Sequence, residues 1–150
     1  MLDEVRVLIV DDDNAILRNL EKVLRIEGYD VDTARTGRDA VEKSKMGSYN
    51  LALLDIKLPD MEGTELLEKM HDTLPKMVKI MVTGYPDLEN AIKSLNMGAD
   101  AYLIKPVSTE RLLDVVKQKL AEQKSVEEMT QEKVKEWIET RVRKLRHGEQ

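Results

Sequence analysis

Four short stretches of this sequence carry side chains that could do chemistry together. They are Asp11-Asp12-Asp13, Asp55, Thr83-Gly84 and Lys105-Pro106, and each lies at the end of a short apolar run. Carboxylates that are packed close together repel one another unless a positive charge compensates them. A divalent cation is the natural counter-charge, so these residue types predict cation-assisted chemistry at a cluster of carboxylates.

The ligand types favour Mg²⁺ over Zn²⁺. Mg²⁺ is bound through carboxylates, backbone carbonyls and water, and it takes phosphate as a further ligand. The chain has no cysteine, and neither of its two histidines falls at the end of an apolar run. A carboxylate beside such a cation can attack a phosphoryl group and form an acyl phosphate. Lys105 and Thr83 would then contact the phosphoryl oxygens, and Gly84 would leave room for the incoming phosphate.

The elements that must position these residues are read from hydrophobic periodicity. Five short strand-like segments, the first of them almost continuously apolar, alternate with five segments of helical spacing, which predicts strands over 5–10, 29–34, 51–54, 78–82 and 101–104. Helices are expected between 16 and 28 and over 38–46, 64–70, 87–97 and 109–122. Strict alternation predicts a doubly wound α/β fold, a parallel sheet with helices on both faces. Ligands of such sheets bind outside the carboxyl ends of the strands, where the four reactive stretches fall.

The chain after residue 122 is expected to form a polar connector or a frayed helix end, followed by a separate amphipathic helix. Thr130 can serve as the N-cap of that helix, which ends near Arg146. Its apolar stripe consists of Val134, Ile138, Val142 and Leu145. The stripe needs a cover, either its own domain or a second subunit in a two-helix coil. We therefore expect a domain over 1–122 and a helical extension over 123–150.

Composition narrows the range of functions. The 150 residues suit one domain, and 41% hydrophobic with 35% charged residues is typical of a soluble globular protein. No apolar stretch approaches the roughly 20 residues of a membrane span, so we expect no membrane partner and a cytoplasmic location. The formal net charge of -5 argues against direct binding of nucleic acid. The absence of cysteine excludes disulfides and thiol nucleophiles.

The reactive stretches, with the runs that precede them, resemble the receiver domain of two-component response regulators. The matching segments are Val7–Asp13, Leu53–Pro59 continuing to Gly63, Met81–Gly84 and Ala101–Pro106. Each segment alone is a weak signal, but four in the right order are specific. The resemblance covers about residues 5–122.

This resemblance implies a flavodoxin-like fold with strand order 2-1-3-4-5 and a phosphorylated aspartate. By the same resemblance, a sensor histidine kinase or phosphotransfer protein would phosphorylate Asp55. Asp12, Asp55 and the backbone carbonyl of Lys57 would hold Mg²⁺, while Asp11 would support the acidic pocket. The chain would act as a phosphoacceptor that assists its own phosphorylation and dephosphorylation, and not as an enzyme.

The resemblance also implies how the switch is transmitted. Lys105 and Thr83 would contact the phosphoryl group, and Tyr102 would turn inward when Thr83 moves. The surface that changes would be the face formed by the fourth helix, fifth strand and fifth helix, roughly residues 87–122. We expect a downstream protein partner to bind there, and a homodimer is possible.

Three alternatives remain open from the sequence. The chain could be the receiver part of a longer regulator with an ATPase or DNA-binding output, although no recognisable output domain follows in the printed sequence. It could instead be a Mg²⁺-dependent phosphotransferase or phosphatase with an aspartyl-phosphate intermediate. Such enzymes usually need a second general acid near the nucleophile, and Lys57 stands two residues after Asp55. A third reading is a structural dimerisation module whose aspartate pocket is unused.

Overall fold

The centre of the sheet forms because the runs of aliphatic and β-branched residues in its three central strands can be buried on both faces. The computed structural model describes residues 4–70, 76–84 and 87–148. All five strands are parallel, in the order β2-β1-β3-β4-β5. Their bounds are β1 Arg6–Val10, β2 Asp30–Ala34, β3 Leu51–Leu54, β4 Val78–Thr83 and β5 Ala101–Ile104. The predicted doubly wound fold and its strand order are therefore confirmed.

Most of the helices begin at a polar side chain that satisfies free N–H groups of the first turn. The helices are α1 Asn14–Ile26, α2 Gly37–Met46, α3 Gly63–Lys69, α4 Leu88–Asn96 and α5 Thr109–Arg146. Asp13, Thr36, Asp87 and Ser108 cap α1, α2, α4 and α5. α3 follows Glu62, whose side chain makes no capping hydrogen bond.

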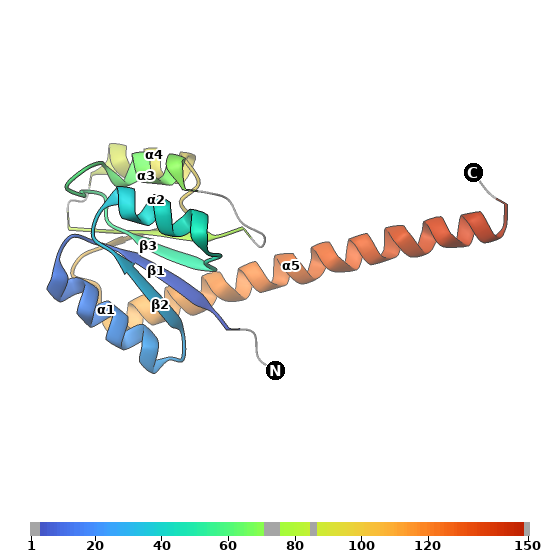
Figure 1. The fold of residues 1–150 in the computed structure, drawn as a ribbon, viewed down its shortest axis with the longest axis horizontal. Coiled ribbons are helices and arrows are strands. Elements are labelled where there is room, and N and C mark those ends of the chain that lie inside the picture. The colour runs from blue at the N-terminus through green and yellow to red at the C-terminus, as the bar shows by residue number, and fades with distance from the viewer. Residues whose placement is uncertain (1–3, 71–75, 85–86, 149–150) are drawn as a thin grey trace.

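The helices cover the sheet from both sides, and alternate strand residues enter two separate cores. α1 and α5 lie on one face of the sheet, and α2, α3 and α4 lie on the other (Figure 1). Val7 and Ile9 of β1 belong to the core under α1 and α5, whereas Leu8 and Val10 belong to the core under α2 and α3. Both faces of the central strands are thus buried, and their carboxyl ends are left to form a site.

The C-terminal part of the chain differs from the sequence-based expectation. α5 is one continuous helix of 38 residues, so residues 123–129 form neither a connector nor a frayed end. Thr130 is not an N-cap, because its hydroxyl donates a hydrogen bond to the carbonyl of Val126 at 2.9 Å within the helix. The additional C-terminal helix exists as the far end of α5, which projects beyond the sheet as a single rod (Figure 1).

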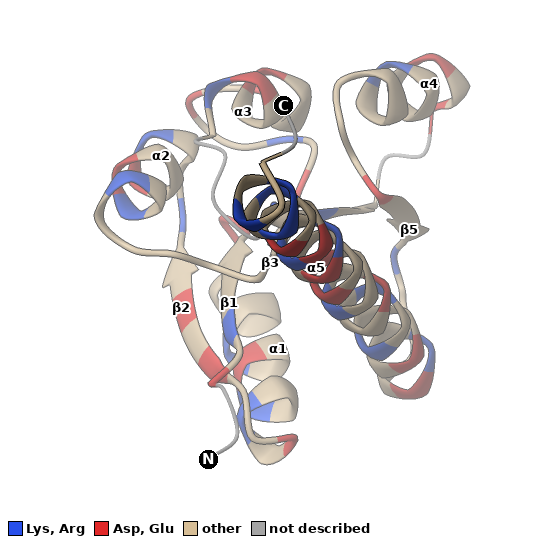
Figure 2. Ribbon diagram, turned by 90° about the vertical axis from the view of Figure 1, so that its right-hand side faces the viewer, with Lys and Arg blue, Asp and Glu red and all other residues tan. Residues whose placement is uncertain are grey.

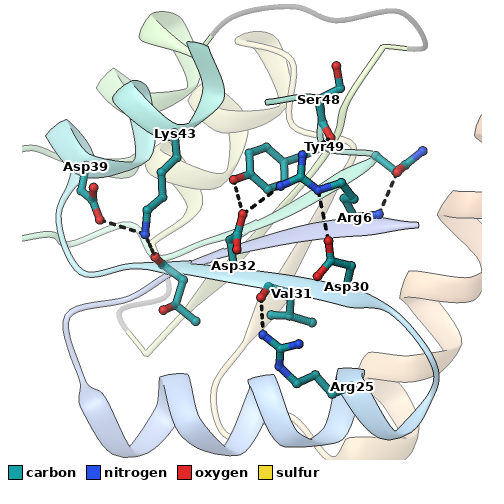
Figure 3. A network of polar contacts seen from close by, with 11 residues as sticks. Arg6, Arg25, Asp30, Val31, Asp32, Asp39, Lys43, Ser48 and Tyr49 are labelled. Carbon is teal, nitrogen blue, oxygen red and sulfur yellow. Dashed lines mark hydrogen bonds and ion pairs between the residues drawn. The ribbon is translucent and has the colours of Figure 1, made fainter. Parts of the chain in front are cut away.

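A polar network ties the strands together at the amino end of the sheet. The Arg6 guanidinium pairs with Asp30 at 3.3 Å and with Asp32 at 3.0 Å, and it lies 4.7 Å from the centroid of the Tyr49 ring. The Tyr49 hydroxyl donates to the same Asp32 carboxylate at 2.6 Å (Figure 3). These contacts join β1, β2 and the segment before β3, at the edge opposite the carboxyl ends.

None of the described helices combines the length and the apolar character needed to cross a membrane. The cytoplasmic location stays a prediction.

Candidate functional site

The four reactive stretches meet at the carboxyl edge of the sheet. Asp11 directly follows β1, Asp55 follows β3, and Lys105 follows β5, while Thr83 is the last residue of β4. The parallel pairing of β1 with β3, β3 with β4 and β4 with β5 brings these strand ends to one side. The order also reverses here, because β1 lies between β2 and β3. This is the position at which doubly wound sheets bind ligands.

Three carboxylates form the acidic part of the site. Asp11, Asp12 and Asp55 each offer a carboxylate oxygen within 4.8 Å of the other two. Asp11 and Asp55 are buried, with 3% and 6% of their surface exposed, and Asp12 is exposed at the rim. Asp13 does not belong to the cluster: its side chain accepts hydrogen bonds from Ala15 and caps α1.

Lys105 provides the positive charge of the site. Its ammonium lies 2.6 Å from a carboxylate oxygen of Asp11 and 3.5 Å from Oδ2 of Asp55. Burial lowers the pKa of Lys105, but the hydrogen bond and the charge of Asp11, together with Asp55, outweigh it and raise that pKa. Lys105 is therefore a permanent cation shared between two acids, and it sits closer to Asp11 than to the predicted phosphoacceptor.

Asp55 has an environment that favours loss of its negative charge. Burial raises the pKa of Asp55, and the neighbouring Asp11 raises it further, against the opposing effect of Lys105 and a backbone hydrogen bond from Lys57. Its Oδ1 atom is buried and makes no hydrogen bond to the described residues. A buried carboxylate oxygen without a partner is rare. This oxygen therefore keeps its capacity to accept a hydrogen bond or to bind a cation.

The remaining predicted site residues lie in the loop after Asp55 and on β4 and β5. The backbone N–H of Lys57 donates to the Asp55 carboxylate, and its side chain is exposed. Thr83 is fully buried at the end of β4. Tyr102 of β5 packs against the core under α2, α3 and α4, and its buried hydroxyl has no hydrogen-bond partner among the described residues. The Tyr102 ring therefore already lies inward in this structure.

The contacts of two residues that support the site were not predicted from the sequence, although Gly63 ends one of the matching segments. Asp60 accepts hydrogen bonds from the N–H groups of Gly37 at 2.8 Å and Arg38 at 2.9 Å, which ties the loop after Asp55 to the start of α2. At Gly63 an added Cβ would lie 2.5 Å from the backbone oxygen of Asp55. An acidic residue and a glycine in the loop after the nucleophile were the available signals, but neither reveals such contacts by itself.

His147 takes no part in this arrangement. His147 follows the far end of α5, and His71 lies outside the described residues. A carboxylate-rich site with a backbone carbonyl available suits a hard cation such as Mg²⁺.

Comparison with known proteins agrees with this geometry. The family model described as "Response regulator receiver domain" matches residues 7–117. The cell cycle response regulator CtrA of Brucella ovis is 33% identical over 109 residues, which cover 73% of this chain and 47% of that protein. The chain therefore spans about half the length of the curated relatives it matches.

Solved structures share both the fold and much of the sequence. The receiver domain protein (CheY-like) from Methanospirillum hungatei JF-1 is 55% identical, with a TM-score of 0.79 over 82% of this chain and 98% of that chain. The beryllofluoride-activated NtrC4 receiver domain dimer is 36% identical, with a TM-score of 0.73 over 79% of this chain and 98% of that one. Strand-end chemistry, sheet order, family match and sequence identity all agree, and this chain belongs to the response regulator receiver domain family of two-component systems.

Proposed function

We propose that Asp55 accepts a phosphoryl group from the phosphohistidine of a sensor kinase or phosphotransfer protein, in a Mg²⁺-dependent reaction that switches protein binding. The observation that carries this proposal is the Oδ1 atom of Asp55. It is buried, has no partner among the described residues, and lies in a cluster of carboxylates next to a lysine. Family membership supports the same role for this aspartate.

Asp12, Asp55 and the backbone carbonyl of Lys57 would hold the cation, with Asp11 in support. The donor set fits, because three carboxylates within 4.8 Å of one another carry more negative charge than one lysine compensates. When bound, Mg²⁺ would supply charge neutralisation for the carboxylates and the phosphoryl oxygens.

The protein's own residues would carry out the transfer. A carboxylate oxygen of Asp55 forms a bond to phosphorus while the phosphorus–nitrogen bond of the donor histidine breaks, and the electron pair of that bond stays on the imidazole nitrogen. The Lys105 ammonium already forms ion pairs with Asp11 and Asp55, and it can contact a phosphoryl oxygen. Thr83 offers a hydroxyl from the end of β4. Hydrolysis of the acyl phosphate restores Asp55, so we propose a phosphoacceptor and not an enzyme with an external substrate.

The output surface would be the face of α4, β5 and α5. Thr83 and Tyr102 lie on the neighbouring strands β4 and β5 and would connect the site to this face. Exposed aliphatic side chains on α4 and β5 make it suited to binding a protein; they are Leu88, Ile92, Leu95 and Ile104.

The test is phosphorylation by a small donor. The protein is incubated with Mg²⁺ and acetyl phosphate, and intact mass is compared between wild type, Asp55→Asn and Asp13→Asn. We expect a phosphoryl adduct on wild type and on Asp13→Asn, because Asp13 only caps α1. The adduct should be lost in Asp55→Asn and when Mg²⁺ is removed with a chelator.

An adduct that persists in Asp55→Asn would contradict the assignment of the phosphoacceptor. A multiple-turnover assay with phosphate esters separates the proposal from the phosphotransferase alternative. We expect no steady release of phosphate from such esters, whereas sustained turnover would favour an enzyme. If neither acetyl phosphate nor beryllium fluoride acts in the presence of Mg²⁺, the pocket is unused and the proposal fails.

A further inference from the structure

The distal part of α5 carries an apolar stripe that its own chain does not cover. Every residue from 124 to 148 is exposed. The stripe comprises the apolar side chains Val126, Val134, Trp137, Ile138, Val142 and Leu145. A helical segment without packing is only marginally stable in water, and exposed apolar surface of this extent marks an interaction site.

This stripe continues the face with which α5 packs on its own domain. Val116 is buried in the core under α1 and α5, and Val134 follows 18 residues later. At 3.6 residues per turn, 18 residues make about five full turns, so both side chains point the same way. Gln123 fixes the helix where it leaves the sheet, because its amide donates to the carbonyls of Asn50 at 2.9 Å and Lys76 at 2.7 Å. The stripe is thereby held in a defined direction.

Charge along the distal helix is strongly asymmetric. Residues 121–132 contain four glutamates and one lysine, whereas residues 133–147 contain six lysines and arginines and two glutamates. Figure 2 shows blue dominating the C-terminal end of α5, with red following along the helix towards the domain. Two parallel copies would place acid against acid and base against base. Two antiparallel copies would place each half against its complement.

We propose that the distal part of α5 pairs with the same segment of a second copy of this chain, antiparallel and centred on Val134. Residues equally distant from Val134 then face each other across the pair. Glu127 meets Arg141, both of which lie on the stripe. The remaining facing pairs are Val126 with Val142, Thr130 with Ile138, Gln123 with Leu145, and Val134 with itself.

A groove at the point where α5 leaves the sheet fits the antiparallel register centred on Val134. It has a volume of about 580 Å³ and is lined by Met77 and Val78 on the sheet side and by Gln123 and Val126 on α5, among others. In the antiparallel pair the other copy's helix end is level with these α5 residues. Val142 and Leu145 of the second copy can then enter the groove, whereas a parallel pair would place them at the far end of the helix.

Charge reversal tests the pairing without phosphorylation, so its result does not depend on the role of Asp55. Molar mass is measured by light scattering for wild type, Glu127→Arg, Arg141→Glu and an equimolar mixture of the two variants. Wild type should be a dimer. Each variant alone should be monomeric, because like charges face each other twice in its homodimer. The mixture should recover the dimer, because every Arg then faces a Glu.

Cross-linking tests the orientation, since the chain has no cysteine of its own. Val126→Cys and Val142→Cys are oxidised separately and as a mixture. We expect a disulfide-linked dimer in the mixture and none for either variant alone. A dimer of Val142→Cys with itself would establish a parallel pair and overturn the proposal. So would a monomeric wild type, or a dimer unaffected by Glu127→Arg, which would place the interface elsewhere.

Discussion

Asp55 shows how a reactive residue opposes the stability of its own fold. Two buried acids, Asp11 and Asp55, share one lysine, and the Lys105 ammonium lies closer to Asp11. Oδ1 of Asp55 has neither a hydrogen bond to the described residues nor exposure to solvent. A buried charge that is poorly paired costs free energy. In the metal-free protein, Asp55 therefore destabilises the native state, and reactivity and stability are in conflict at this residue.

Asp55→Asn should consequently stabilise the metal-free protein by about 1 kcal/mol, because it removes one of two competing negative charges and leaves the Lys105–Asp11 pair intact. The measurement is urea unfolding in the presence of a chelator. Asp11→Asn is the matched control and should not stabilise the protein, since it removes the 2.6 Å ion pair. A lower unfolding free energy for Asp55→Asn than for wild type would contradict this account.

Gly63 is required by close approach of the backbone and not by turn geometry. An added Cβ would lie 2.5 Å from the backbone oxygen of Asp55, 2.7 Å from Cε of Met81 and 2.9 Å from Cα of Ile56. Two of these three atoms belong to the backbone, so they cannot move aside easily. Gly63→Ala should lower the unfolding free energy by about 2 kcal/mol and slow phosphorylation, because it displaces the backbone of Asp55.

The matched control for that change is Gly84→Ala at the other side of the site. Among the described residues, a Cβ there meets only Lys105 side-chain atoms, at 3.9 Å or more. Its unfolding free energy should stay within about 0.5 kcal/mol of wild type. Equal effects of the two substitutions in urea unfolding would show that the contact with Asp55 is not what makes Gly63 necessary.

Most elements could be predicted from the sequence because they obey local rules. Four of the five strands are short runs rich in apolar residues and β2 alternates polar with apolar residues, and the observed strand bounds differ from the expected ones by one residue at most. The error in α5 has a local cause as well. Residues 122–130 are mostly polar, which looked like a connector, yet they include neither glycine nor proline and consist largely of good helix formers. Low apolar density indicates exposure, and it was mistaken for a break in the helix.

Side-chain contacts between elements could not be predicted from the sequence. Convergence of Asp11, Asp55, Thr83 and Lys105 follows from strand order alone and was predicted. That the Lys105 ammonium lies nearer Asp11 than Asp55 depends on side-chain geometry. The same holds for Asp60, which reaches 23 residues back to the N–H of Gly37.

The polar network at the amino end of the sheet, which joins β1 and β2, makes part of the stability of the fold depend on pH. Burial, followed by the hydrogen bond to Asp32, raises the pKa of Tyr49 from 10.0 to about 12. A raised pKa in the folded state means that the unfolded chain loses this proton first. The contribution of Tyr49 to stability is therefore fully present below pH 10.0 and is lost as the pH rises towards about 12.

Tyr49→Phe should remove this pH dependence. Below the titration range the variant should be less stable by about 1 kcal/mol, since it lacks the hydrogen bond to Asp32. The difference in unfolding free energy between wild type and variant should then shrink as the pH rises from 10.0 to about 12. Because other groups titrate in both proteins, only the difference is diagnostic. A constant difference across this range would contradict the raised pKa.

The whole molecule combines a receiver domain with a long helix, α5. The first part of α5 packs on the sheet, and its distal part projects from the domain. Both cores are complete by Leu120, the last α5 residue that packs against them. Beyond it, Gln123 makes the two hydrogen bonds that hold the helix at the exit from the sheet. The folding unit therefore ends at Gln123, although the helix does not.

Two truncated chains test where the folding unit ends. The chain 1–124 keeps Gln123 and should unfold cooperatively with nearly the unfolding free energy of the monomeric full-length variant Glu127→Arg, because every described residue it lacks is exposed. The chain 1–122 lacks Gln123, whose amide donates hydrogen bonds to the carbonyls of Asn50 and Lys76. Its unfolding free energy should be lower by about 1–2 kcal/mol. Full-length Gln123→Ala should reproduce that loss, whereas Gln118→Ala should not, because the exposed Gln118 amide donates to Glu122 of the same helix. An unfolding free energy of 1–124 as low as that of 1–122 would contradict this boundary. The distal helix would then be part of the folding unit, because its exposed stripe would contribute to stability within a single chain.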